Sequence, residues 1–526
     1  MSEPELRSDP LGGSALARLA MDGGAPPAWY PPAPARAEGW RERAAAVRAD
    51  FRGDEWLRSL APALAATGPA AARLERAAAA GILVTTGQQP GLFGGPIYTW
   101  SKALSALALA DAIEAATGIP AAPVFWAATD DADFAEASET RVALPGRAER
   151  LRIAPTAPEG TPMAAVPLGD DVAPLLRILA RAAGSVANAA PLEAARRAYR
   201  PGESVGAAYC ALLRELFAPY GIAVLDASHP ATRVAAFPFL RNALVAAERV
   251  EAALLARSRE IADRGLAPQV SLVDGLSLVF ANAGTGKQRV GVSDAAAVAA
   301  RARSGDLSPN VLLRPVAERA LLPTVAYMAG PGELAYFAQV GAVADALGVS
   351  PPLALPRWSG TILEPHVAAI LARLAMDEAE LGDPHRAETR LASAAAPKAL
   401  HDALADARGA VAALATALRT SPETRGVVPD AVVEGTARSL LQRVDRLERR
   451  YLAAIKRREE ALMREVGTAR ASLYPDGLRQ ERALNFLPFL ARYGEPLVDR
   501  MRAAANAHAM RVAGLGRAAE RAPART

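Results

Sequence analysis

The sequence is poor in the residues that build disulfides and metal clusters. Its 526 residues include one cysteine, Cys210, so an intramolecular disulfide or a cysteine-based metal site is excluded. The five histidines lack the spacing of zinc ligands. No uncharged apolar run reaches the ~18 residues of a membrane helix, and no apolar signal segment follows the acidic N-terminus. We expect a soluble cytoplasmic protein, without membrane association or a tightly bound metal or redox cofactor.

Long blocks of one charge are also missing. Lysine and arginine number 60 and aspartate and glutamate 56, and the two signs are mixed along the chain, which argues against a nucleic-acid partner. Lysine itself is scarce and occurs only at Lys102, Lys287, Lys398 and Lys456. Any functional lysine must therefore be one of these four.

The first three quarters of the chain alternate between strand and helix patterns. Residues 82–86 read as a buried strand, 87–96 as a glycine-rich loop and 97–116 as a helix, and a second buried strand follows at 123–128. Further strands are expected at 222–226, 270–280, 311–313 and 324–328, with helices near 203–219, 231–263 and 331–347. This alternation predicts an α/β fold with a mainly parallel, Rossmann-like sheet over residues 1–375, led by an irregular arm at 1–40.

The pattern changes to purely helical after residue 376. Apolar residues recur with the 4-3 spacing of a coiled coil from Leu400 to Leu418, and a second apolar stripe runs from Leu440 to Val466. We predict a long antiparallel helical hairpin at 376–472 and a closing segment, 473–526, that packs back on the core or the hairpin. Because two helices make a narrow core, we expect the hairpin to form a homodimer, although it could instead cap the same chain.

The segment Thr86–Pro96 joins a strand to a helix and carries four glycines. Backbone N–H groups in such a loop can approach an anionic ligand closely, although the sequence is neither a GxGxxG nor a Walker A motif and a structural tight turn is the alternative. The binding candidates in it are Gly87, Gln88, Gln89, Gly91, Gly94 and Gly95. Tyr98 and Lys102 follow on the helix and could reach the same ligand, unless Lys102 is a surface lysine.

An acidic run follows the next strand. Asp130, Asp131 and Asp133 lie where parallel sheets place their ligands, so one carboxylate could act as a general base, or the group could bind an amine or Mg²⁺. A solvated turn or a helix cap would leave them without chemistry.

A third strand–turn–helix segment spans residues 324–333. It would bring Gly332, Glu333 and Tyr336 to the same crevice, although Glu333 is as well explained as a helix-capping residue. Arg314 and Arg357 lie beside neighbouring predicted strands, where each could bind a carboxylate ligand or form a salt bridge.

One tempting motif is discounted. Residues 284–287 read Gly-Thr-Gly-Lys, like the end of a P-loop, but Ala281 stands where the first glycine belongs and Gln288 where a Mg²⁺-binding hydroxyl belongs. We do not predict a P-loop there.

Taken together, these segments resemble the BshC family of bacillithiol biosynthesis. The matching segments are Thr86–Pro96, 125–134, 313–315 with 322–324, Gly330–Tyr336, and 473–482, which reads LYPDGLRQER. They occur in matching order over residues 80 to 500. The resemblance implies a Rossmann-like core with a coiled-coil appendage.

The resemblance also implies an activity. Members of the family are described as ligases that add cysteine to the amine of glucosaminyl-malate, and amide formation in water needs an activated carboxylate, which implies ATP with Mg²⁺. Gly87, Gln88, Gln89, Gly91, Gly95 and Pro96 match the family's glycine loop.

The acidic run departs from the family at two positions. Asp131 and Asp133 match, but the family commonly reads Thr-Glu-Asp-His-Asp, and this chain has Asp130 for the glutamate and Ala132 for the histidine. Asp131 or Asp133 is our candidate base.

Our leading hypothesis is an ATP-assisted cysteine ligase in which Lys102, Asp131, Asp133 and Glu333 are catalytic. A nucleotidyl transferase or ligase that activates another small acid is an alternative. A non-catalytic coiled-coil interaction protein is another, and Ala132 is the residue that favours it.

Overall fold

The computed structural model describes residues 3–283, 286–383 and 385–516, so Gly284 and Thr285 of the discounted P-loop segment lie outside the described residues. The chain divides into two compact units. The first comprises residues 1–142, 150–363 and 481–526, and the second comprises 143–149 and 364–480. Within the described residues, no helix is long and apolar enough to cross a membrane.

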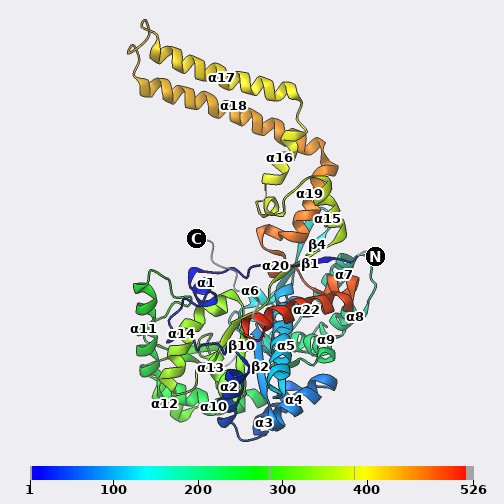
Figure 1. Ribbon diagram of the computed structural model, residues 1–526, viewed down its shortest axis with the longest axis vertical. Helices are drawn as coiled ribbons and strands as arrows, with labels where there is room; N and C mark the ends of the chain where they lie inside the picture. The colour runs from blue at the N-terminus through cyan, green and yellow to red at the C-terminus, as the bar shows by residue number, and fades with distance from the viewer. Residues whose placement is uncertain (1–2, 284–285, 384, 517–526) are drawn as a thin grey trace. The chain divides into compact units, whose positions relative to one another are not determined.

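A five-stranded sheet forms the centre of the first unit (Figure 1). Its order is β11 (Ala354–Pro356), β10 (Thr324–Ala329), β2 (Ile82–Gln88), β3 (Ala121–Ala127) and β6 (Ala223–Asp226). All neighbours are parallel, which confirms the predicted Rossmann-like sheet. The strand order reverses between β2 and β10, and such a reversal opens a ligand crevice at the carboxyl ends of the strands.

Helices that are buried on nearly every side pack against this sheet. α5 (Ile97–Thr117) lies on β2 and β3 and is covered in turn by α22 (Glu495–Val512), so it is buried nearly all round. α14 (Pro331–Leu347) packs against α1 (Ala15–Met21), α11 (Ala247–Asp263) and β11 and is buried in the same way. These two helices begin beside the reversal point of the sheet and present their first turns to it.

The first unit also contains a second, antiparallel sheet. In this region, two strands predicted from the sequence need correction. The sheet consists of β7 (Leu276–Ala283), β8 (Gly286–Gly291) and β9 (Leu307–Pro309), so the strand expected at 270–280 begins at Leu276 and lies outside the parallel sheet. The strand predicted at 311–313 is wrong. Asn310 accepts hydrogen bonds from the backbone N–H groups of Leu312 and Leu313, which forms a turn instead.

Two further predictions need correction. The expected helix at 231–263 is two helices, α10 (Pro230–Val245) and α11, which are separated at Ala246. The segment 1–40 is not irregular throughout, because it contains α1 and the strand β1 (Glu5–Ser8), which pairs antiparallel with β12 (Gly360–Leu363). Short edge elements of this kind carry little hydrophobic periodicity.

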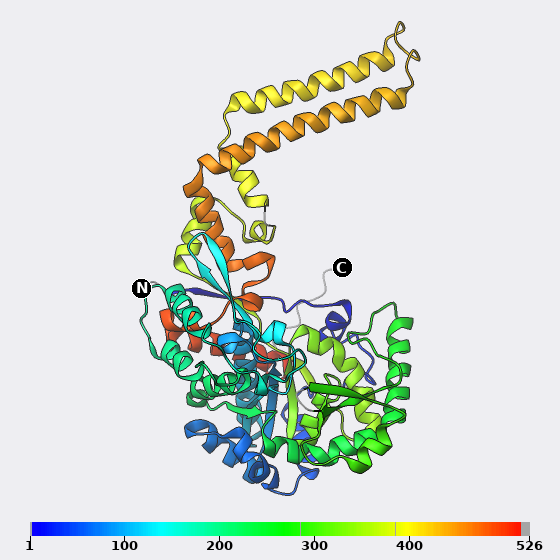
Figure 2. The same cartoon turned by 180° about the vertical axis from the view of Figure 1, so that it is seen from behind.

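The second unit contains the predicted hairpin. α17 (Lys398–Thr420) and α18 (Asp430–Arg458) lie side by side and antiparallel (Figures 1 and 2), and α19 (Glu460–Leu473) continues the second arm. Leu404 is the buried residue of α17, and α18 has none. Large apolar side chains are therefore exposed on both arms, at Leu414, Leu418, Val432, Leu440, Leu447 and Tyr451.

The closing segment returns to the first unit. α21 (Leu487–Tyr493) packs against α7 (Val172–Ala183) and α8 (Ala190–Ala198), and α22 packs on α5. The remaining helices are α2 (Ala37–Ala49), α3 (Glu55–Leu64), α4 (Gly68–Ala80), α6 (Phe134–Ala137), α9 (Val205–Phe217), α12 (Ala295–Arg301), α13 (Arg314–Leu321), α15 (Pro365–Arg373), α16 (Arg386–Ala394) and α20 (Gln480–Ala483). The remaining strands are β4 (Glu139–Leu144) and β5 (Arg147–Arg152), which form an antiparallel pair.

Candidate active site

A cavity of about 810 Å³ lies in the first unit at the carboxyl ends of β2, β3 and β10, where the strand order reverses. Most of the residues singled out from the sequence line it. They are Gly87, Gln88, Gln89, Tyr98, Lys102, Asp130, Asp131, Arg314, Gly332, Glu333, Tyr336 and Arg357. The three strand-end segments chosen from the sequence therefore meet at one cavity.

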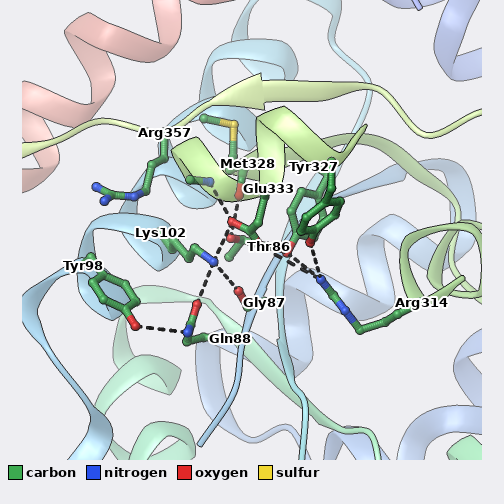
Figure 3. Close-up of polar contacts among 12 residues, drawn as sticks. Thr86, Gly87, Gln88, Tyr98, Lys102, Arg314, Tyr327, Met328, Glu333 and Arg357 are labelled. Carbon is green, nitrogen blue, oxygen red and sulfur yellow. Dashed lines mark hydrogen bonds and ion pairs between the residues drawn. The ribbon is translucent and has the colours of Figure 1, made fainter. Parts of the chain in front are cut away.

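A buried ion pair, Lys102 with Glu333, joins α5 to α14 at the floor of the cavity (Figure 3). Lys102 Nζ lies 2.7 Å from Glu333 Oε2, donates to Gly87 O at 2.7 Å and donates to Gln88 Oε1 at 2.8 Å. Since an ammonium has three N–H bonds, these partners use all of them. The contacts favour a positioning role for Lys102, which fixes the end of β2 and the Gln88 amide.

Glu333 is held by several donors. It accepts hydrogen bonds from Tyr327 Oη and from Gly330 N, each at 2.6 Å, and the latter contact caps α14. Burial alone would raise the pKa of Glu333, but Lys102 and Arg314 outweigh it, and the pKa lies below its ordinary value. Burial lowers the pKa of Lys102.

Arg314 also lines the cavity and extends this network to Tyr336 and Glu318. Its guanidinium donates to Tyr336 Oη at 3.1 Å and lies 3.5 Å from Glu318, a carboxylate that is only 2% exposed. Burial raises the pKa of Glu318 to about 7, against the opposing effect of Arg314. The cavity floor thus rests on buried charges.

The acidic run divides into separate roles. Asp130 forms an ion pair with Lys287 at 3.2 Å, and Asp131 accepts hydrogen bonds from Gln89 Nε2 and from the backbone N–H of Asp133, each at 2.8 Å. Asp133 does not line the cavity but caps α6 by accepting from Glu136 N at 3.1 Å. Among the described residues, no group of three or more histidine, cysteine, aspartate or glutamate side chains is placed to hold a metal ion.

Glu136 is a carboxylate of the cavity that we did not single out from the sequence. Its side chain is open to the cavity, and its Oε1 accepts from Tyr98 Oη and from Gln88 Nε2, each at 3.3 Å. Loss of surrounding water raises the pKa of Glu136, and the charges of Asp133 and Asp131 raise it further.

The arginines at the cavity are of two kinds. Arg357 is buried and forms a bidentate ion pair with Glu481, with both N–O distances at 2.8 Å, so its charge is already balanced. Arg289 and Arg482 also line the cavity and are exposed. Within the described part of the chain, neither forms an ion pair or a hydrogen bond. These two cations remain available to an anionic ligand.

Comparisons with known proteins match both units. The model of the BshC N-terminal Rossmann-like domain of bacillithiol biosynthesis matches residues 34–297 and 294–358, and that of the BshC C-terminal coiled-coil domain matches residues 360–512. The chain belongs to the BshC family. It is 34% identical over 477 residues to a Solibacter usitatus protein named "Putative cysteine ligase BshC", covering 87% of this chain and 89% of that protein.

Other relatives carry the same name. The chain is 32% identical to the Koribacter versatilis protein, with 84% of this chain and 85% of that protein covered. It is 30% identical to the Salinibacter ruber protein, with 82% and 81% covered. The resemblance noted from the sequence is therefore confirmed, and membership of the BshC family shows that the protein is a ligase.

The glycine loop of this BshC protein has two parts with different surroundings. We call Gly87–Gln89 the near half, because it lines the cavity, and Gly91–Gly95 the far half. The far half is buried, and Gly91, Gly94 and Gly95 are not among the residues that line the cavity. These three predicted binding residues are thus not part of the cavity wall.

Side chains hold the far half in place. Asn485 Nδ2 donates to the carbonyls of Leu92, Phe93 and Gly95 at 3.0–3.3 Å. Tyr199 Oη accepts from Gly94 N at 3.3 Å and donates to Gly91 O at 3.2 Å. Gly94 has a φ of +87°, which a side chain would strain.

Four charged residues of the cavity were not singled out from the sequence, although three of them carried a signal. Lys287 is one of only four lysines, and Arg289 follows two positions later on β8, so both share one strand face. Arg482 ends the LYPDGLRQER segment that supported the family resemblance. Glu136 had no signal of its own, because its place at the cavity depends on how α6 begins.

Proposed function

We propose that this protein joins the carboxyl group of cysteine to the amine of glucosaminyl-malate in bacillithiol biosynthesis, with ATP and Mg²⁺ activating the carboxyl group. The observation that carries this proposal is the composition of the cavity, where the unpaired cations Arg289 and Arg482 accompany the carboxylates Asp131 and Glu136. Guanidinium groups suit the carboxylates of malate or the phosphates of ATP, and carboxylates suit the amine.

The residues of the cavity divide the work of such a ligation. Arg289 and Arg482 bind and orient anionic groups, while Gln88 and Gln89 offer amides for polar groups of the sugar. Lys102, Glu333 and Arg314 keep the cavity floor rigid through their mutual contacts. ATP supplies the leaving group of the activated carboxyl. Holding the amine and the activated carbon together is itself a large part of the rate enhancement.

We place this reaction in the cytoplasm, where the thiol of the cysteine substrate stays reduced. The protein's own Cys210 is buried and does not compete for thiol chemistry.

The proposal is tested by mass spectrometry of purified protein with glucosaminyl-malate, cysteine and MgATP, each component being omitted in turn. We expect the cysteinyl product in the complete mixture alone. Product without ATP would overturn the activation step. Absence of product from folded protein, or a preference for another acid, would overturn the substrate assignment.

We also propose that the protein forms a homodimer through the α17–α18 hairpin. Exposed apolar side chains on both arms support this, because two helices cannot cover them alone. Sedimentation analysis should show a dimer, and the double variant Leu414→Glu, Leu418→Glu should be a monomer. A dimer that persists in this variant, or a monomeric wild-type protein, would contradict the hairpin interface.

A further inference from the structure

Four carboxylates line the cavity, and three of them have committed partners. Asp130 is paired with Lys287, and Glu333 is paired with Lys102. Asp131 accepts hydrogen bonds through both oxygens, from Gln89 on one and from the backbone of residue 133 on the other. These three carboxylates are therefore already engaged by donors of the chain itself.

Glu136 is the fourth carboxylate, and its contacts differ. Both of its partners, Tyr98 and Gln88, are neutral and contact only Oε1. In the described part of the chain, Oε2 of Glu136 accepts no hydrogen bond, and the side chain is open to the cavity. Glu136 therefore has an oxygen to offer to a ligand.

The orientation of Glu136 is fixed from the cavity floor. Lys102 donates to Gln88 Oε1, so the amide of Gln88 must present its Nε2 toward Glu136 and Tyr98. Gln88 Nε2 donates to Tyr98 Oη at 3.1 Å, which leaves the phenolic proton for Glu136. The chain from Lys102 to Glu136 thus holds one carboxylate oxygen and leaves the other free.

We propose that Glu136 Oε2 is the proton acceptor for the amine of the substrate, with Tyr98 and Gln88 as its positioning residues. This inference rests on the proposed function and names the base for it. Ala132, which also lines the cavity, offers no proton acceptor of its own.

The proton transfer fits the ligation. Glu136 takes one proton from the substrate ammonium, and the freed nitrogen lone pair attacks the acyl carbon of cysteine, activated by ATP as an acyl phosphate or acyl adenylate. The C–N bond forms, the bond from carbon to the phosphoryl oxygen breaks, and its electron pair leaves with the phosphate group. The second nitrogen proton passes to that leaving group or to water.

The surroundings of Glu136 raise its pKa. Loss of surrounding water is the main cause, the charges of Asp133 and Asp131 add to it, and Tyr98 and Lys102 oppose it without reversing the shift. A raised pKa brings a carboxylate closer to the range in which a general base works well.

The decisive experiment compares Glu136→Gln with Asp131→Asn and with the matched control Glu75→Gln, at an exposed position of α4 outside the cavity, which should keep the wild-type rate. Glu136→Gln should lower kcat by about 10²–10⁴-fold with little change in the KM for cysteine. Its pH profile should lose the ionisation that controls the wild-type rate at low pH. Glu136→Asp should recover part of the rate.

A second measurement separates proton acceptance from activation and from folding. Hydroxylamine is already unprotonated at neutral pH, so Glu136→Gln should form cysteine hydroxamate from MgATP and cysteine at the wild-type rate. A kcat of Glu136→Gln within threefold of wild type, or an equal loss of hydroxamate and amide, would overturn the role of Glu136. Failure of the wild-type protein to make product would instead overturn the proposed function.

Discussion

The two halves of the glycine loop lie a few residues apart and have different tasks. The near half, Gly87–Gln89, lines the cavity and is tied to the buried ion pair of Lys102 with Glu333. The far half, Gly91–Gly95, is buried and is held by neutral hydrogen bonds from Asn485 and Tyr199. A glycine-rich sequence is therefore not by itself a ligand loop, since close packing demands glycine as much as a ligand does.

The largest expected effect is the loss of stability when the far half is released. Asn485→Ala would leave several buried carbonyls without a donor, so we expect the free energy of unfolding to fall by about 3 kcal/mol. Because all six tryptophans belong to the first unit, urea unfolding followed by tryptophan fluorescence reports on that unit alone. The control Asn506→Ala, on an exposed position of α22, should leave the midpoint unchanged. Equal midpoints for the two variants would break the comparison.

Substitutions at two glycines, one in the far half and one in the cavity wall, should separate an effect on stability from an effect on substrate binding. Gly94→Ala should cost about 1–2 kcal/mol, because φ is +87° and the new Cβ would lie 3.2 Å from Leu212. Gly332→Ala meets no atom within 4 Å, so it should unfold like wild type while its methyl group raises the KM. Urea midpoints and steady-state kinetics of both variants check this, and a destabilised Gly332→Ala would speak against it.

Substitutions in the near half should change the activity and leave the stability of the fold unchanged. Gln89→Ala removes the 2.8 Å hydrogen bond to Asp131, so kcat/KM should fall about tenfold, the equivalent of one charge-assisted hydrogen bond. The neighbour of Lys287 on β8, Gln288, is exposed and lies outside the cavity, so Gln288→Ala is the matched control. A Gln89→Ala variant with full activity would remove Gln89 from the site.

The smallest expected effect is a change of stability with pH. It should concern the near half alone, because only the near half is tied to buried charges. The pKa of Glu318 is about 7 in the folded protein and 4.5 in the unfolded chain, so between these values the folded state binds more protons. Stability of wild type relative to Glu318→Gln should therefore fall by about 1 kcal/mol as the pH rises from 6 to 7. The cost of Asn485→Ala should not change over that interval. A flat difference for Glu318→Gln would contradict the buried charge.

Long, strongly patterned elements were predictable from the sequence. β2, α5, β3 and α14 are rich in apolar residues, so the parallel sheet, its helices and the three strand ends that meet at the cavity followed from the pattern. The 4-3 spacing likewise indicated the α17–α18 hairpin.

What escaped prediction depends on contacts between distant parts of the chain. The far half accepts hydrogen bonds from Asn485, some 390 positions away in sequence, and no local sequence pattern predicts that contact. Arg357 is neutralised by Glu481, which lies 124 positions away in sequence. Glu136 reaches the cavity because Asp133 starts a four-residue helix, which is too short for a periodic signal.

The most direct test of the account is a crystal structure of the protein with glucosaminyl-malate bound. We predict ligand density in the cavity between the ends of β2 and β10, with a carboxylate at Arg289 or Arg482 and the amine within hydrogen-bond distance of Glu136 Oε2. Contacts should include the near half of the glycine loop and omit the far half. Density at another place in the molecule, or against Gly91–Gly95, would contradict the account.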